Sequence, residues 1–291
     1  MELAHLLSLK TAVPYLRLFR NQLFVIKLGG EAVADRRQLD SILEQLMMLH
    51  QLGIRLILVH GGGAQATELG GKLGIESEFI DGRRVTSPAM IDALVMALNG
   101  QVRTEILSRC RVQKLDAIGL SGIDAGLVIA TKRAPVKTST GEKVNFGQVG
   151  DIHGIDTRPL TAILEAGMVP VVSSLACDEN GVVLNINADL VAASIAIAAE
   201  AAKLVLVTKP RGVLEDVARP ETLISQLSLG EMDALTASGV IRGGMLPKLT
   251  AAKKALEGGV DRVHVISSEY PDSVLAELFT NEGCGTMICN D

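Results

Sequence analysis

Short apolar runs alternate with amphipathic stretches along most of the chain. The runs are rich in Val, Ile and Leu and carry few polar residues, as is typical of strands buried on both faces of a parallel sheet. Between them, apolar residues recur at intervals of three or four, which predicts amphipathic helices. The alternation therefore predicts an α/β fold in which helical layers cover a mostly parallel sheet. The clearest predicted strands are 24–28, 54–60, 169–173, 203–208 and 262–266.

Two of these predicted strands lead into glycines. The strand 24–28 carries Lys27 near its end, and the strand 54–60 ends at His60, just before the glycines 61–63. Ligands bind at the carboxyl ends of parallel strands, where glycine N–H groups and helix N-termini contact anions. The pattern is neither the nucleotide loop ending in Gly-Lys-Ser/Thr nor the dinucleotide fingerprint. Lys27 is either an anion-binding cation or a solvated charge, and His60 is either catalytic or structural.

Three further polar motifs stand at the ends of predicted elements. The turn 81–86 carries two arginines, whose planar guanidinium groups suit a carboxylate, and we expect Arg84 to point inward. The sequence 185–189, Asn-Ile-Asn-Ala-Asp, leads into a predicted helix and is either a helix cap or a binding cluster. Lys248 lies near the N-terminus of the predicted helix 247–257, where its charge opposes the helix dipole. An anion is therefore expected beside Lys248.

Composition excludes several classes of protein. The 291 residues are 48% hydrophobic, yet no apolar stretch reaches the ~20 residues that a membrane-spanning helix needs. The N-terminus lacks the pattern of a secretory signal. A net charge of −5, with five Phe, two Tyr and no Trp, argues against nucleic-acid binding. Four cysteines without zinc-site spacing predict buried, reduced thiols in a cytoplasmic protein: Cys110, Cys177, Cys284 and Cys289.

Two segments are expected outside the core. Residues 4–20 predict an amphipathic helix, interrupted near Pro14, which is either a surface flap or a contact with another subunit. The polar segment 137–150 contains a Thr-Gly-Glu turn and predicts an exposed hairpin able to act as a lid. A soft boundary at 178–181 divides the remaining chain into two halves.

Five motifs together resemble one known family. In chain order they are Ile26-Lys27-Leu28-Gly29-Gly30, Val59-His60-Gly61-Gly62-Gly63, Arg84-Val85-Thr86, Asn185-Ile186-Asn187-Ala188-Asp189 and Gly243-Gly244-Met245-Leu246-Pro247-Lys248. Their order is similar to that in the N-acetylglutamate kinases of the amino-acid kinase family, over nearly the whole chain. The resemblance implies a three-layer αβα sandwich that phosphorylates the γ-carboxylate of N-acetyl-L-glutamate with ATP, giving N-acetyl-L-glutamyl 5-phosphate in arginine biosynthesis. It also implies an N-terminal oligomerisation helix (1–20), an amino-acid substrate lobe (21–180) and a nucleotide-binding lobe (181–291).

The resemblance assigns roles to individual residues. Lys27 and Lys248 would offset the charge of the migrating phosphoryl group, and Asp189 would hold both ammonium groups. A carboxylate substrate is already ionised at neutral pH, so no general base is required. Mg²⁺ is expected on the ATP phosphates, without a metal site of the protein's own. Substrate contacts are implied at Gly62, Gly63, Arg84 and Asn185, and nucleotide contacts at Gly29, Gly30, Thr208, Lys209, Gly212, Val213, Ile241, Gly243 and Gly244.

The nucleotide loop departs from the family pattern. Members usually carry Thr/Ser-Asp-Val before a glycine, whereas this chain reads Thr208-Lys209-Pro210-Arg211-Gly212, and Ile123 stands where a lysine is usual. Both charge and backbone freedom therefore change where the nucleotide is expected. Two alternatives stay open: a catalytically weakened, arginine-sensing paralogue, and a kinase for a related acidic amino acid, since Arg84 would accept any α-carboxylate. We favour the active kinase, because both lysines and the aspartate are present.

The two ends of the chain resemble those of arginine-inhibited members. In such proteins N-terminal helices interlace dimers into a hexameric ring. The resemblance implies a homo-oligomer, a dimer or a hexamer, that L-arginine inhibits. The alternative is that His264 and Glu277 are ordinary surface residues. The implied effector residues are Tyr15, Lys203, His264, Glu277 and Gly283.

Overall fold

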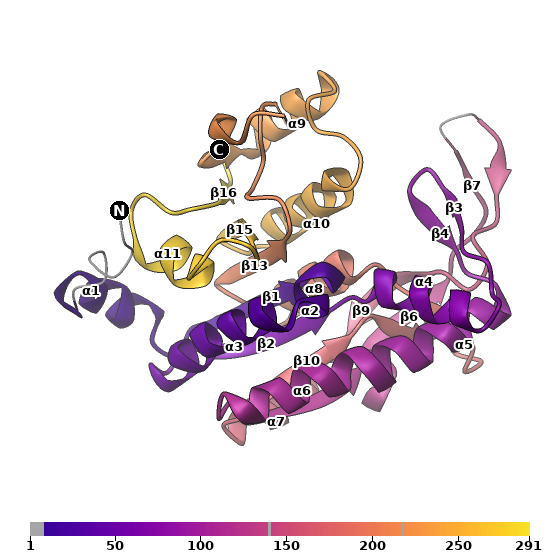
Figure 1. The fold of residues 1–291 in the computed structure, drawn as a ribbon, viewed down its shortest axis with the longest axis horizontal. Helices are drawn as coiled ribbons and strands as arrows, with labels where there is room; N and C mark the ends of the chain where they lie inside the picture. Colours follow the sequence, from indigo (N-terminus) through magenta and orange to yellow (C-terminus); the bar gives the residue numbers. More distant parts are fainter. Residues whose placement is uncertain (1–8, 139–140, 217) are drawn as a thin grey trace.

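A computed structural model describes residues 9–138, 141–216 and 218–291, and its centre is an eight-stranded sheet between layers of helices (Figure 1). The strands are β1 (Leu23–Leu28), β2 (Arg55–His60), β5 (Ala117–Ser121), β10 (Val169–Ser173), β13 (Lys203–Thr208), β14 (Gln226–Ser228), β15 (Arg262–Ser267) and β16 (Thr286–Cys289). They lie in the order β14-β16-β15-β13-β1-β2-β10-β5. Neighbouring strands are parallel except β15 and β16. The predicted mainly parallel α/β fold is confirmed.

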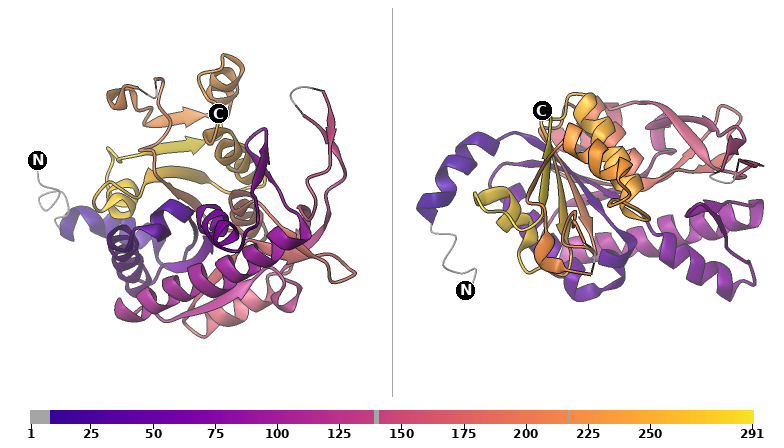
Figure 2. Two further views of the ribbon diagram at one scale, coloured as in Figure 1. Left: turned by 45° about the vertical axis from the view of Figure 1, so that its right-hand side comes forward. Right: turned by 90° about the horizontal axis from the view of Figure 1, so that it is seen from above.

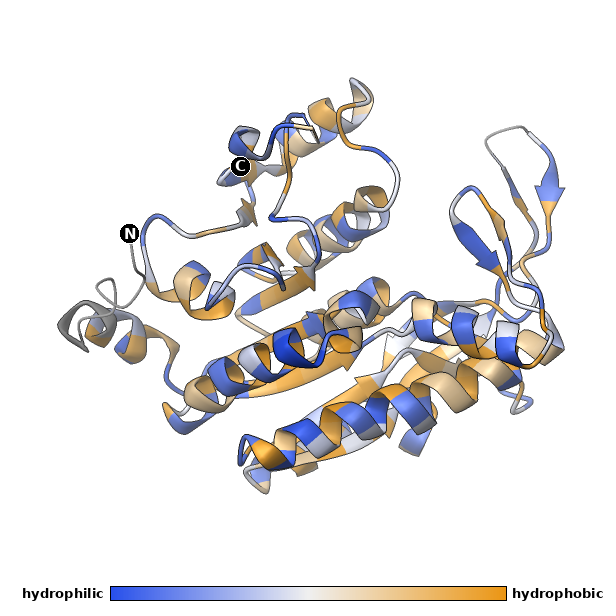
Figure 3. Cartoon of the chain, in the orientation of Figure 1, coloured by the Kyte–Doolittle hydropathy of each residue, from blue (hydrophilic) through white to orange (hydrophobic). Residues whose placement is uncertain are grey.

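The centre of the sheet is apolar on both faces. All six residues of β1 are buried, with Phe24 and Ile26 in the core on one face and Val25 in the core on the other. The first face is covered by α2 (Gly30–Ala34), α3 (Arg36–Gln51), α6 (Arg103–Val112) and α11 (Ser273–Phe279). The second face is covered by α7 (Arg158–Glu165), α8 (Ala188–Ala198), α9 (Leu229–Ala237) and α10 (Met245–Glu257). Figure 2 shows these layers from two directions, and Figure 3 shows the apolar strands beneath mixed helices.

A smaller region built on a mixed sheet extends the molecule at one end. Its four-stranded sheet has the order β12 (Val183–Asn185), β11 (Leu175–Cys177), β6 (Val128–Lys132) and β9 (Gly150–Ile155). Two hairpins project from it, β3 (Glu78–Ile80) with β4 (Arg83–Val85), and β7 (Val136–Lys137) with β8 (Lys143–Val144) (Figure 1). Strand β12 follows the predicted lobe boundary yet pairs with β11, so the division at 180 stays a prediction.

Several boundaries differ from the sequence predictions. Arg84 lies on strand β4 rather than in a turn, because Asp81 and Gly82 form the turn of a hairpin. A π-helical segment, η2 (Met96–Val102), lies between α5 (Pro88–Val95) and α6. The helix predicted after 185–189 is α8, which ends at Ala198. The hairpin within 137–150 is confirmed, although part of its turn, 139–140, lies outside the described residues.

The N-terminal helix α1 (Leu9–Phe19) runs through Pro14 without the predicted interruption. Residues 4–8 of the predicted helix lie outside the described part of the chain. Phe19 packs edge-to-face on Phe24 and Phe279, with ring centres 5.3 Å and 5.6 Å away, which fixes the end of α1 against the sheet and α11. None of the described helices combines the length and apolar character needed to cross a bilayer.

Candidate active site

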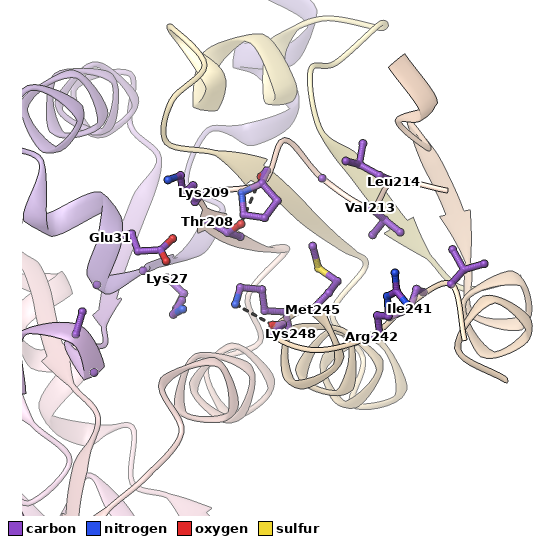
Figure 4. A pocket seen from close by; sticks show the side chains of 18 residues that line it. Lys27, Glu31, Thr208, Lys209, Val213, Leu214, Ile241, Arg242, Met245 and Lys248 are labelled. Atoms are coloured by element: carbon purple, nitrogen blue, oxygen red, sulfur yellow. Dashed lines mark hydrogen bonds between the residues drawn. The ribbon is translucent and has the colours of Figure 1, made fainter. Parts of the chain in front are cut away.

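A cavity of about 490 Å³ opens beyond the carboxyl ends of β1 and β13 (Figure 4). Its walls come from both halves of the chain: the turn after β1, the start of α4 (Gly63–Lys72), the loop after β13 and the start of α10. The described lining carries one carboxylate and four cations, Glu31 against Lys27, Lys209, Arg242 and Lys248. An excess of positive charge in a confined space favours a polyanionic ligand.

Lys27 is buried near the end of β1 and forms an ion pair across the site. Its Nζ lies 2.8 Å from Oδ1 of Asp189, which is buried in the first turn of α8. This contact lacks hydrogen-bond geometry, so we treat it as an ion pair. Asn187 caps α8, because its Oδ1 accepts from the N–H of Asp189 at 2.8 Å. The sequence 185–189 thus provides both a helix cap and a charged partner for Lys27.

Lys248 faces the same cavity from the first turn of α10. Its Nζ donates to the carbonyl oxygen of Gly244 at 3.2 Å. Burial lowers the pKa of Lys248; the charge of Asp189 opposes that shift, and the charge of Lys27 adds to it. The three predicted catalytic residues therefore gather at one cavity. Contact of Asp189 with both ammonium groups stays a prediction, because its ion pair here is with Lys27.

The glycine turns after β1 and β2 pack against each other, and Gly29, Gly30 and Gly63 line the cavity. A Cβ on Gly30 would lie 2.9 Å from Oε1 of Gln65 and 3.4 Å from Cα of Gly62, so a side chain there would displace Gln65. His60 is fully buried, its Nδ1 is 2.9 Å from the Gly61 carbonyl oxygen, and burial lowers its pKa to about 4. A neutral, enclosed imidazole supports the structural alternative for His60.

Arg84 lies beside the glycine turn rather than on the cavity lining. Its Nη2 donates to the Gly63 carbonyl oxygen at 2.9 Å and to Oγ1 of Thr67 at 2.6 Å, and its Nη1 donates to Oγ of Ser77 at 2.7 Å. Burial lowers its pKa, whereas its neighbour Arg83 is exposed, so Arg84 is the inward arginine, as predicted.

Asn185, at the end of β12, donates from Nδ2 to Oγ1 of Thr86 at 3.1 Å. This bond links Asn185 to the end of the Arg84-Val85-Thr86 motif. The four predicted substrate residues thus adjoin one another through Gly63, Arg84 and Thr86, and Gly63 shares the cavity lining with the two lysines.

The predicted nucleotide residues other than Gly29 and Gly30 form the opposite wall. Thr208, Lys209, Gly212, Val213, Ile241 and Gly244 line the cavity, whereas Gly243 lies beside it in a backbone conformation with φ of 60°. Apolar side chains of Val213, Leu214 and Ile241 stand at the end away from Glu31, with Arg242 among them, and Met245 lies beside Lys248 (Figure 4). The cavity therefore joins an end with Lys27 and Lys248 to an end lined mainly by apolar side chains together with Arg242, which suits a nucleotide with phosphates and a base.

The predicted effector residues form a second cluster, on the other side of β13. Lys203, His264 and Glu277, which we call the buried triad, are linked by contacts of 3.1 Å between Lys203 Nζ and His264 Nε2 and 2.8 Å between His264 Nδ1 and Glu277 Oε1. A Cβ on Gly283 would approach Glu277 Oε2 to 2.8 Å. Tyr15 lies nearby, its ring 6.0 Å from that of Phe279. The alternative that His264 and Glu277 are surface residues is wrong, since both are buried.

Protonation within the buried triad follows from its geometry. Lys203 donates to Nε2 of His264, so the imidazole carries its hydrogen on Nδ1 and donates to Glu277. Burial lowers the pKa of Lys203 to about 8 and lowers that of His264. Burial acts to raise the pKa of Glu277, but the bond from His264 and the N–H groups of Cys284 and Gly285 lower it overall. The triad thus holds a carboxylate beside a neutral imidazole.

Sequence reasoning missed several residues of the site. Glu31, Leu214 and Arg242 line the cavity but belong to no motif, and no pattern in the sequence singles them out. Among the described residues, no group of three or more His, Cys, Asp or Glu side chains is placed to hold a metal ion.

Comparisons with known proteins agree with this geometry. The model of the amino acid kinase family matches residues 22–267. An acetylglutamate kinase of Symbiobacterium thermophilum is 42% identical over 280 residues, which cover 96% of each chain.

Solved structures of another protein also share the fold. The N-acetylglutamate synthase of Neisseria gonorrhoeae, complexed with coenzyme A and N-acetyl-glutamate, superposes with a TM-score of 0.82 at 27% identity. The match covers all of this chain but only 64% of the synthase. The same synthase complexed with coenzyme A and L-arginine gives a TM-score of 0.79 at 26% identity, covering 66% of that protein.

Proposed function

Since the chain belongs to the amino acid kinase family, we propose that it transfers the γ-phosphoryl group of ATP to the γ-carboxylate of N-acetyl-L-glutamate, forming N-acetyl-L-glutamyl 5-phosphate. The observation that carries this proposal is the convergence of Lys27 and Lys248 on one cavity from opposite halves of the chain. Relatives about 40% identical over nearly their whole length are acetylglutamate kinases.

The residues suit phosphoryl transfer to a carboxylate. Such a substrate is already ionised at neutral pH and attacks without a general base. The remaining task is to offset charge on the migrating phosphoryl group and on the two oxygens between which it moves. We assign Lys27 to the substrate side and Lys248 to the nucleotide side, with Asp189 orienting Lys27. Arg84 and Asn185 would bind the substrate's polar groups next to the glycine turn.

The nucleotide would lie along the opposite wall, with its base at the apolar end and its phosphates toward the lysines. We propose that Mg²⁺ is held chiefly by the ATP phosphates, because it keeps few protein ligands in such sites. Glu31, the carboxylate that lines the described cavity, is the side chain placed to reach it. The ion would supply further neutralisation of phosphate charge.

We further propose that L-arginine regulates the enzyme from the buried triad. A guanidinium group binds a carboxylate in two parallel hydrogen bonds, so L-arginine would take Glu277 over from the groups that bond it here, His264 and the N–H groups of Cys284 and Gly285. The related synthase has been solved with L-arginine bound. Helix α1, with Leu18 65% exposed, is the surface we propose for assembly into a dimer or hexamer in the cytoplasm.

One assay tests the catalytic proposal. The purified chain is incubated with ATP, Mg²⁺ and N-acetyl-L-glutamate, and the acyl phosphate is trapped with hydroxylamine. L-glutamate and N-acetyl-L-aspartate serve as competing acceptors. The proposal predicts hydroxamate with N-acetyl-L-glutamate at a kcat/KM at least about tenfold above either competitor, since one mismatched polar contact costs about 1–3 kcal/mol. Equal use of L-glutamate would favour a kinase for another acidic amino acid, and no hydroxamate would favour a non-catalytic arginine sensor.

A further inference from the structure

Arg211 occupies a special place in the wall of the nucleotide cavity. Residues 208–210 and 212–214 line that cavity, whereas Arg211 between them does not. Its side chain turns away, toward the C-terminal segment. Its Nε donates to the Cys284 carbonyl oxygen at 3.1 Å, and its guanidinium carbon lies 5.1 Å from the centre of the Tyr270 ring. Arg211 thus connects the cavity wall to Cys284 and Tyr270 on the side away from the cavity.

The peptide that Arg211 binds is held on its other side by the buried triad. The N–H groups of Cys284 and Gly285 each donate to Oε2 of Glu277 at 2.8 Å. The other carboxylate oxygen of Glu277 bonds His264, which contacts Lys203. A continuous set of polar contacts therefore runs from the triad through Cys284 to Arg211 and the cavity wall.

Thr286 makes this connection tight. Its Oγ1 accepts from the Val213 N–H at 2.8 Å and donates to the Ile224 carbonyl oxygen at 2.6 Å. A Cβ on Gly212 would lie 2.5 Å from the same Oγ1, so the wall and the segment 284–286 are in close contact. Packed contacts of this kind transmit displacements rather than absorbing them.

We propose that Arg211 is a positioning residue for the nucleotide: it fixes the cavity wall to the segment whose place Glu277 sets. It touches no substrate itself. The inference rests on the proposed function, because it takes ATP to be the ligand that binds against this wall of the cavity. A change at Glu277, whether by substitution or by a bound guanidinium compound, would reach the nucleotide through Arg211.

The test compares Arg211→Met, Glu277→Gln and the double variant by calorimetry with a non-hydrolysable ATP analogue and by steady-state kinetics. Arg211→Met should weaken analogue binding and raise the KM for ATP about 3- to 10-fold, the value of one hydrogen bond with its stacking contact. The kcat and the KM for the acceptor should stay within about twofold. Arg211→Lys, which keeps a cation over Tyr270, should recover part of the affinity.

A double-mutant cycle between Arg211 and Glu277 distinguishes a positioning role of Arg211 from a defect confined to the Arg211 site. Glu277→Gln should weaken analogue binding in the parent protein and have an effect at least about threefold smaller in the Arg211→Met background, because contacts in one network are not additive. Arg219→Met is the matched control. Arg219 is also an exposed arginine between β13 and β14, but it pairs with Asp216 rather than with the segment 284–286. Where Glu277→Gln fails to fold, Tyr270→Leu replaces it in the cycle, with the same expectation.

Additive effects, or an Arg211→Met variant that binds the analogue within twofold of the parent, would overturn the inference. Analogue binding needs no acceptor, so a parent protein that binds the analogue yet makes no acyl phosphate would contradict the proposed function alone.

Discussion

The described residues include two clusters of charge, one near β1 and one near β13, and they differ in what their charges face. In the pocket cluster, Lys27, Asp189 and Lys248, both lysines line a cavity at the carboxyl ends of β1 and β13. In the buried triad, Lys203 begins β13, and the polar atoms of the three side chains are bonded to one another or to backbone N–H groups. Burial lowers the pKa of a lysine in both.

This comparison teaches that burial and a shifted pKa do not by themselves identify a catalytic site. What distinguishes the pocket cluster is unbalanced positive charge facing a space that a ligand can fill. The triad is internally neutralised and is linked to the cavity wall through the segment 284–286, which contacts that wall at Arg211 and through the side chain of Thr286. We therefore assign chemistry to the first cluster and control of the fold's C-terminal segment to the second.

The largest effect is expected from Lys27→Met. The variant removes a cation from the cavity and leaves the Asp189 carboxylate buried without its partner. We expect kcat to fall about 10²- to 10³-fold and the free energy of unfolding to fall by about 3 kcal/mol. Hydroxamate assays and urea denaturation measure the two quantities. Lys253→Met, which breaks an exposed pair with Asp233, should change unfolding by less than about 1 kcal/mol. If Lys27→Met and Lys253→Met lowered the free energy of unfolding equally, the distinction between the buried and the exposed ion pair would be contradicted.

A smaller loss is expected from Arg84→Met, which tests the substrate side of the pocket. Arg84 contacts Gly63 and Thr67, and its guanidinium is the group we expect to bind a substrate carboxylate. The variant should lower kcat/KM for N-acetyl-L-glutamate about 30- to 100-fold, since a charged hydrogen bond contributes about 1.5–3 kcal/mol. The KM for ATP should not change. Arg83→Met, on the same strand but exposed, is the matched control; if it lowers kcat/KM as much as Arg84→Met does, the assignment of Arg84 is wrong.

The buried triad predicts a dependence of stability on pH. Burial lowers the pKa of Lys203 to about 8 from its ordinary value of 10.5, so between these values the unfolded chain binds more protons than the folded one. The free energy of unfolding should therefore rise with pH between about pH 8 and pH 10.5. Below about pH 8, where Lys203 is protonated in both states, this gain is absent. We expect the parent protein to gain about 2 kcal/mol relative to Lys203→Met between about pH 7.5 and pH 10.5. If the free energy of unfolding changed with pH in the same way for both proteins, Lys203 would not be desolvated in the folded state.

The smallest effect is expected on inhibition by L-arginine. Glu277→Gln removes the carboxylate proposed to bind the guanidinium group, so the inhibitory concentration should rise about tenfold. The rate without L-arginine should fall far less than for Lys27→Met. Glu269→Gln, an exposed carboxylate on the neighbouring loop, serves as the control. An inhibitory concentration unchanged by Glu277→Gln would place any arginine site elsewhere.

The core strands could be predicted from the sequence because their burial on both faces leaves an unbroken apolar run. Strand β1 was found in this way, with Lys27 as its one polar residue. The strands β9, β11 and β12 could not be predicted, since β11 and β12 have only three residues each, β9 mixes polar and apolar residues, and all three are defined by pairing partners rather than by an apolar run. The hairpin at Arg84 did carry a signal in the sequence, the pair Asp81-Gly82. Asp-Gly favours a type I′ turn, which requires positive φ at both residues, and their φ values are 48° and 72°.

The candidate site was predictable where motifs coincide with strand ends. Lys27 lies near the carboxyl end of β1, and Asp189 and Lys248 lie in the first turns of α8 and α10, so the two lysines meet at the cavity on that edge of the sheet while Asp189 pairs with Lys27. Glu31 and Arg242 could not be found, because their inclusion depends on how loops from two halves face each other. The link from Glu277 to Arg211 was equally hidden, since it runs through the backbone of Cys284.

The turnover of Lys248→Ala measures the proposed role of the pocket most directly. Lys248 lies at the start of α10, where its charge opposes the helix dipole, so its removal should leave the free energy of unfolding within about 0.5 kcal/mol. With ATP and N-acetyl-L-glutamate, we predict that kcat falls at least about 100-fold, while Lys253→Ala on the same helix keeps the parent rate. A Lys248→Ala protein that turns over at the parent rate would contradict the assignment of phosphoryl transfer to this cavity.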